Sequence, residues 1–393
     1  MRPITASLAI LAVAAPTLTG CGEQAAAPTT APGDLVLLRA GAERTLTLGA
    51  GSPRTLPAGQ PAVGWRSLYT ATPSGGATTV ARIDVASGRT VGSLRLPGRW
   101  TLPATVIGGA PDAATADGRT LVLARAGGRA ARFALVDASL RRAPRTITLP
   151  GRFAFDAIAP DARRMFLIEP RPGGHYLVRN YDLVRDELMP GAVIDKLEGE
   201  WQMEGQPVAR AVPAAGPWVY TLYRKDEGPF VHALNTEGFA MCIDLPAAAR
   251  SGPAAAGEWG LTLAPSDHTL YAANPALGLV VEFGAGDNPG VRRTARIPRG
   301  AIGAAPRLAV APDAGTLYIP TARGVVAVDT ATLKVRRTLL RGHRVSAVVA
   351  SGRRLYAQDG AVVTLDAASG AVLARTPTSA PPAALAAVLP GSR

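Results

Sequence analysis

The side chains best suited to chemistry are few and far apart in this sequence. Its 393 residues include only four histidines and two cysteines. The chain contains no G-x-S-x-G elbow, no P-loop, no H-E-x-x-H and no acidic calcium loop. The histidines occupy separate segments, with no metal-ligand spacing between any two, at His175, His232, His268 and His343. We therefore predict no catalytic residue, no metal ligand and no cofactor.

One stretch of the chain differs in charge from the rest. Residues 195–245 hold eight acidic and four basic side chains, whereas the whole chain has a net charge of +13. Tryptophans and tyrosines are also concentrated in this stretch. Our hypothesis is that Glu200, Trp201, Glu204 and Arg210 line a binding site for a ligand or partner. The alternative is that this is a longer, well-packed element whose charges are solvated.

The N-terminus carries a targeting signal. The apolar stretch from Ile4 to Ala15 is too short to span a bilayer and has the length of a signal-peptide core. The sequence Leu18-Thr19-Gly20-Cys21 resembles the bacterial lipobox, in which the cysteine is lipidated. The resemblance implies a signal peptide over residues 1–20 and a lipidated first residue, Cys21. The alternative is a plain secretory peptide that is cut elsewhere.

A polar tether follows the anchor. Residues 22–33 have no apolar periodicity, and a flexible chain of this length spans about 20 Å. The segment 21–33 would then hold the rest of the protein outside the cell membrane. Cys242 is left without an intramolecular disulfide partner, and its neighbours Met241 and Ile243 predict a small buried hydrophobe.

The basic excess does not indicate nucleic-acid binding. Lysines and arginines number 42 against 29 acids, but aromatics make up only 5% of the chain and the arginines are scattered. We expect most of this charge to be solvated surface. Near an anionic membrane or wall, it would draw the protein toward that surface.

The body of the chain is a repeat. An apolar-aromatic pair such as Leu317-Tyr318 is followed by an apolar run that closes on an aspartate such as Asp329 or on a substitute such as Asn235. Seven copies keep this order, and turns such as Ala311-Pro312-Asp313 precede the pairs. The runs between turns have the length of strands. Four strands in each unit of about 45 residues predict an all-β fold, a β-propeller.

The unit at residues 306–340 resembles the YVTN-type repeat of extracytoplasmic bacterial propellers. The matching parts are the Pro312-Asp313 turn, the Leu317-Tyr318-Ile319 strand and the strand Val325 to Asp329. Residues 344–376 match nearly as well. This resemblance implies a fold and not a particular function.

The ends of the chain are predicted to close the ring. Residues 383–393 match the innermost strand of the repeat, whereas residues 35–38, 44–48 and 54–56 match its three later strands. Pairing of these ends would complete one split blade and leave no exposed sheet edge. A single propeller over residues 34–393 would thus have eight four-stranded blades, with seven as the alternative.

Three functions are compatible with these features. The leading interpretation is a membrane-tethered, monomeric binding or scaffold module for an envelope protein or glycan. An extracytoplasmic enzyme, lactonase-like or quinone-dependent, is the alternative, but the only obvious inner-strand carboxylates are Asp156, Glu204 and Glu258. An accessory role in a transport or wall-assembly complex is the third.

Overall fold

A computed structural model gives the structure of most of the chain after the N-terminal segment. It describes residues 34–40, 44–49, 51–57, 59–103, 113–125, 129–196, 202–250, 252–378 and 384–390. Strands dominate these residues, and the one α-helix among them is the four-residue α1 (Pro253–Ala256). None of the helices in these ranges is long and apolar enough to cross a bilayer. Cys21 and the proposed signal peptide lie outside the described residues.

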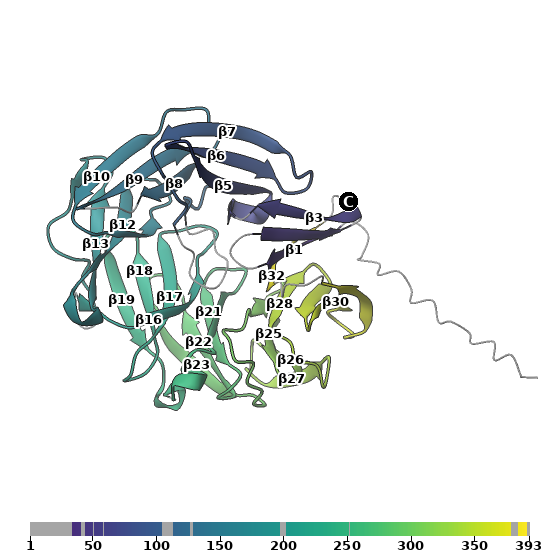
Figure 1. The fold of residues 1–393 in the computed structure, drawn as a ribbon. Coiled ribbons are helices and arrows are strands. Elements are labelled where there is room, and N and C mark those ends of the chain that lie inside the picture. Colours follow the sequence, from purple (N-terminus) through teal and green to yellow (C-terminus); the bar gives the residue numbers. More distant parts are fainter. Residues whose placement is uncertain are drawn as a thin grey trace, which may run out of the picture.

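The strands form eight antiparallel sheets that follow one another around a ring (Figure 1). We number them as blades 1 to 8. The first four contain these strands: β4 (Gln60–Pro61), β5 (Ser67–Ser74), β6 (Ala77–Asp84) and β7 (Thr90–Pro97) in blade 1; β8 (Thr120–Arg125), β9 (Ala130–Asp137) and β10 (Arg145–Pro150) in blade 2; β11 (Ala154–Ile158), β12 (Arg164–Pro170), β13 (Tyr176–Asp182), β14 (Glu187–Leu188) and β15 (Gln202–Met203) in blade 3; β16 (Gln206–Ala211), β17 (Trp218–Arg224), β18 (Phe230–Asn235) and β19 (Phe239–Asp244) in blade 4.

Blades 5 to 8 are four-stranded. They contain these strands: β20 (Gly260–Leu263), β21 (Thr269–Asn274), β22 (Leu279–Gly284) and β23 (Gly290–Arg296) in blade 5; β24 (Ala309–Val310), β25 (Thr316–Thr321), β26 (Gly324–Asp329) and β27 (Val335–Leu339) in blade 6; β28 (Ala347–Ser351), β29 (Arg354–Gln358), β30 (Ala361–Asp366) and β31 (Val372–Pro377) in blade 7; β1 (Leu35–Ala40), β2 (Arg44–Gly49), β3 (Gly51–Pro57) and β32 (Ala384–Leu389) in blade 8. The prediction of eight blades is confirmed.

Blade 8 closes the ring in the predicted way. Its strand order is β3-β2-β1-β32, so the C-terminal strand pairs with the first strand of the chain. Val36 lies opposite Val388, and Leu38 lies opposite Leu385. Figure 1 shows the purple N-terminal strands beside the yellow β32.

The core consists of apolar clusters between neighbouring blades. Strand residues alternate between the two faces of a sheet, so in β1 Val36 and Leu38 pack against blade 7 whereas Leu37 packs against blade 1. Because both faces of a blade are covered, its middle strands are apolar throughout, and all six residues of β22 are buried. The apolar runs in the sequence reflect this burial on both faces.

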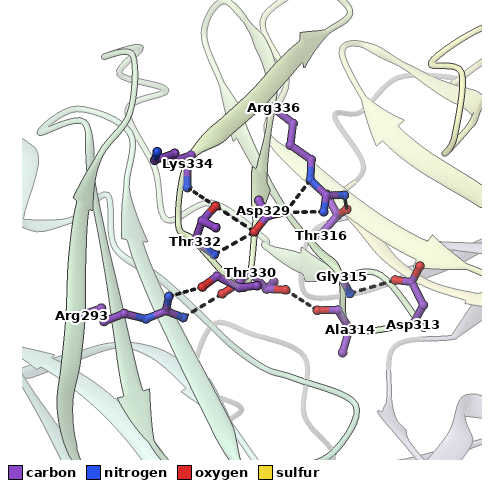
Figure 2. A network of polar contacts seen from close by, with 11 residues as sticks. Arg293, Asp313, Ala314, Gly315, Thr316, Asp329, Thr330, Thr332, Lys334 and Arg336 are labelled. Carbon is purple, nitrogen blue, oxygen red and sulfur yellow. Dashed lines mark hydrogen bonds and ion pairs between the residues drawn. The ribbon is translucent and has the colours of Figure 1, made fainter.

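The aspartate that closes five of the seven repeats has a structural role. Asp329 ends β26, and its carboxylate accepts hydrogen bonds from the main-chain N–H and the hydroxyl of Thr332 and from Arg336 (Figure 2). Asp84 and Asp366 bind a serine three residues later in the same way. These bonds fix the turn between the third and fourth strands, so the repeated acids are turn formers.

Arginines on the fourth strands join blades to one another. Arg293 of β23 donates to the carbonyl oxygen of Thr330 in blade 6 at 2.8 Å (Figure 2), and Arg337 of β27 donates to Ala367 in blade 7 at 2.8 Å. Arg54 binds Ala86 and Arg145 binds Leu183 in the corresponding places. Some of the arginines therefore form contacts between blades. From the sequence, we had expected most of this charge to be solvated.

Candidate functional site

The predicted site residues do not form one cluster in the described structure. Glu200 and Trp201 lie outside the described residues. Glu204 precedes β16, with 45% of its side chain exposed and Oε2 at 3.9 Å from Nδ1 of His175. Arg210 lies six residues further along, near the other end of β16. Six extended residues span about 20 Å, so these two side chains do not contact one small ligand together.

Arg210 forms a buried ion pair between blades 3 and 4. Its Nη1 lies 2.9 Å from Oδ1 of Asp156, and its Nη2 donates to the main-chain oxygen of Asp156 at 2.9 Å. The two side chains are 4% and 10% exposed. Both residues lie on the innermost strands of their blades, so the pair fixes the position of one blade against the next. Removal of either side chain would destabilise the fold, because the remaining charge would be buried without a counter-charge.

A cavity of about 130 Å³ lies beside this ion pair. Its walls are mainly small apolar residues, and Arg210 provides a charged group. It is lined by Gly64, Ala114, Ala116, Ala157, Ile158, Pro160, Arg210, Val212, Pro213, Ala214, Gly216, Pro217, Trp218, Val219 and Thr236. The wall therefore takes residues from four consecutive parts of the ring, blades 1 to 4.

A wider groove of about 610 Å³ adjoins the cavity. The two share four wall residues, namely Pro160, Gly216, Pro217 and Thr236. The groove adds charges of both signs from Asp161, Arg163, Arg164 and Glu237. We call the cavity and groove together the blade 3–4 cleft. An apolar recess with a polar mouth is the usual form of a binding site.

A row of polar residues crosses the face of blade 4 that is turned toward blade 3. Arg210 lies opposite Thr221, Thr221 opposite His232, and His232 opposite Cys242. We call these four residues the polar row. Cross-strand neighbours share one face of a sheet, and the contacts of Arg210 with Asp156 place that face against blade 3. Apolar residues fill the opposite face, so the polar row is specific to this interface.

His232 and Thr221 are the most enclosed members of the polar row, and His232 has the more distinctive surroundings. It is 3% exposed, its ring meets that of Tyr223 edge-on at 6.2 Å, and its Nδ1 lies 3.4 Å from Sγ of Cys242. Burial lowers the pKa of His232 below its ordinary value, which keeps the imidazole neutral. Burying such polar groups costs free energy unless they are partnered, so a function is the natural reason to retain them.

Cys242 does not lie in the purely apolar surroundings that its sequence neighbours predicted. The residue is half-buried, and its Sγ lies 3.9 Å from Sδ of Met203. Its main-chain N–H donates to Oδ2 of Asp195 at 2.7 Å. The sequence contained one signal for the polar row. Thr221 and His232 are polar residues within strands that are otherwise mainly apolar.

The three inner carboxylates do not converge on a metal site. Asp156 binds Arg210, and Glu258 accepts hydrogen bonds from the main-chain N–H groups of Ile302 at 2.7 Å and Gly303 at 2.9 Å. Glu204 lies elsewhere, beside His175. Among the described residues, no three His, Cys, Asp or Glu side chains are grouped as a metal site. The donor set that the enzyme alternative requires is therefore not formed by these carboxylates.

Comparison with known proteins identifies the fold. No protein-family model matches the chain, and no curated protein matches it. The solved structure of apo AztD from Citrobacter koseri is 13% identical with a TM-score of 0.57, and the match covers 92% of this chain and 99% of that one. The Dos1 propeller is 9% identical with a TM-score of 0.50, covering 83% and 89%. BamB from Moraxella catarrhalis is 18% identical with a TM-score of 0.49, covering 79% and 83%. At these identities the likeness shows the β-propeller fold alone.

Proposed function

We propose that this chain is an extracytoplasmic, lipid-anchored β-propeller that binds a protein partner at the blade 3–4 cleft. The observation that carries the proposal is the joining of a small apolar cavity to a charged groove on a rigid ring. A cavity of about 130 Å³ matches the size of one apolar side chain, and the groove has the charges needed to bind the polypeptide on either side of it. A segment of an envelope protein is the partner that fits this chemistry.

The anchor rests on the N-terminal sequence. A lipid on Cys21 and the tether 22–33 would hold the ring within about 20 Å of the membrane surface. Removal of residues 1–20 takes away one arginine, leaving 41 bases against 29 acids, or +12. This charge would attract the monomeric ring to an anionic surface and favour encounter with envelope partners.

A pair of neighbouring alanines provides the test. Ala214 lines the cavity, whereas Ala215 is also exposed but does not line it. The variant Ala214→Trp should obstruct the cavity, and Ala215→Trp should leave it open. The full chain is cross-linked in cells and recovered from the detergent-solubilised envelope.

The expected result is an envelope protein recovered with the wild type and with Ala215→Trp, but lost with Ala214→Trp. Thermal unfolding of both variants checks that the ring is intact. Equal recovery of the same partners with both variants would show that the cleft is not the binding site.

A further inference from the structure

Two sulfur atoms and one imidazole nitrogen lie in a row at the outer part of the blade 3–4 interface. Nδ1 of His232 lies 3.4 Å from Sγ of Cys242, and Sγ of Cys242 lies 3.9 Å from Sδ of Met203. They come from three strands, β18, β19 and β15. His232 and Cys242 are direct cross-strand neighbours, and Met203 is brought to them by the pairing of β15 with β13 of blade 3.

These separations are those of ligands around one metal ion. An ion about 2.3 Å from sulfur and about 2.1 Å from nitrogen, with near-tetrahedral angles, places nitrogen and sulfur ligands about 3.5 Å apart and two sulfurs about 3.8 Å apart. The observed distances of 3.4 Å and 3.9 Å agree with both values. The pairs His232–Cys242 and Cys242–Met203 therefore already have the separations of two ligands on one ion.

We propose that His232, Cys242 and Met203 form a binding site for one Cu(I) ion. The thiolate and the thioether are soft ligands that favour Cu(I) over harder divalent ions, and imidazole is also a good copper ligand. Zinc sites commonly hold four ligands from cysteine, histidine and carboxylates, and a thioether is not among them. On binding, the Cys242 thiol releases its proton to water and its sulfur bonds to copper, which remains Cu(I).

The surroundings hold the ligands in place. The carboxylate of Asp195 accepts the main-chain N–H of Cys242 at 2.7 Å, which fixes the edge strand β19. Tyr223 packs edge-on against His232 and limits rotation of the imidazole. Cys242 lies on the edge strand of blade 4 and is half-buried. Such outer contacts orient metal ligands and strengthen binding.

Met203 offers the cleanest test, because replacement by leucine conserves its volume. The full chain is reduced, and Cu(I) is titrated anaerobically in competition with bicinchoninate. We expect one equivalent bound by the wild type, an affinity lower by roughly 10- to 100-fold in Met203→Leu, and loss of the site in Cys242→Ser. Met241→Leu, on the same strand as Cys242 but outside the cluster, is the matched control and should bind as the wild type does.

X-ray absorption of the copper-loaded protein provides a second readout. The wild type should show two sulfur neighbours, and Met203→Leu should show one. Unfolding curves for each variant establish that the ring remains folded. Unchanged affinity in Met203→Leu or Cys242→Ser would overturn the proposal, as would tighter binding of Zn(II) than of Cu(I). These measurements need no partner at the cleft, so they are independent of the proposed function.

Discussion

The carboxylate of Asp34 accepts a hydrogen bond from Nη1 of Arg354 at 2.9 Å, although 320 residues separate the two in the chain. The hydroxyl of Tyr356 donates to the same oxygen. Asp34 immediately precedes β1, and both partners lie on β29 of blade 7. The start of the split blade is thus fastened to its neighbour by polar contacts as well as by the pairing of β1 with β32.

Replacement of Asp34 by alanine should destabilise the closed ring. Arg354 and Tyr356 would lose a shared acceptor, and Tyr356 is buried, so the free energy of unfolding should fall by about 1–3 kcal/mol. Urea unfolding followed by tryptophan fluorescence measures the change. Asp226→Ala, which removes an exposed carboxylate, is the control and should change it by less than about 0.5 kcal/mol. Equal effects of the two variants would show that the Asp34 contacts do not stabilise closure.

The inter-blade arginines yield a second prediction. Arg293 binds Thr330 of the next blade and also pairs with Glu282, whose side chain is only 7% exposed. Arg293→Ala should lower the free energy of unfolding by about 1–3 kcal/mol, because the carbonyl oxygen of Thr330 would lose its donor from the neighbouring blade and Glu282 would lose its counter-charge. Thermal or urea unfolding provides the measurement.

Arg296→Ala is the matched control for that variant. Arg296 lies on the same strand, but its guanidinium donates at 3.3 Å to Leu277 of its own blade. A loss of stability in Arg296→Ala as large as in Arg293→Ala would contradict the inter-blade role.

The blades and the closure could be predicted from the sequence because each depends on local patterns. Where an aspartate closes a repeat it forms a turn within three residues, as Asp329 does with Thr332, so the spacing of these turns is visible in the sequence. The terminal strands were recognisable because they match the strand pattern of complete units such as residues 306–340. Both features repeat around the ring, which made them detectable without any knowledge of contacts.

The turn at Asp329 provides a prediction about pH. Hydrogen bonds from Arg336 and Thr332 lower the pKa of this carboxyl from 3.8 to about 2. A lowered folded-state pKa stabilises the fold above pH 4, and this contribution is lost as the pH falls from about 4 through about 2. Carboxyl titration by NMR should give a value near 2 in the wild type and a value closer to 3.8 in Arg336→Met. An unchanged pKa in that variant would show that Arg336 is not the cause.

The anchor provides the last prediction. Cys21→Ala removes the proposed lipid attachment, so the protein should move from the membrane fraction to the soluble fraction of the exported proteins. Cys242→Ser keeps the lipobox and should remain with the membrane. Immunoblots of fractionated cells measure both. A Cys21→Ala protein that still sediments with the membrane would show that no lipid on this residue is needed.

The candidate sites were harder to predict because they depend on register between strands. His232 and Cys242 are ten residues apart, and Arg210 and Asp156 are 54 apart, yet each pair is in contact. A repeat pattern predicts that strands pair, but it does not show which residues lie opposite one another. The acidic stretch includes the strands of blade 4, where the candidate sites lie, whereas the neutral side chains Met203 and Thr221 carried no signal of charge.

The split blade has a consequence for how two copies of this protein can interact. The last strand, β32, is held in its place by pairing with β1 and by packing against blade 7. When β32 detaches, the exposed edge of β1 can pair with β32 of a second chain, because the hydrogen bonds between the two strands would be identical. Exchange of β32 between two open rings would produce a domain-swapped dimer that uses the same contacts as the closed monomer. The amount of this dimer would depend on how often β32 detaches from its own ring.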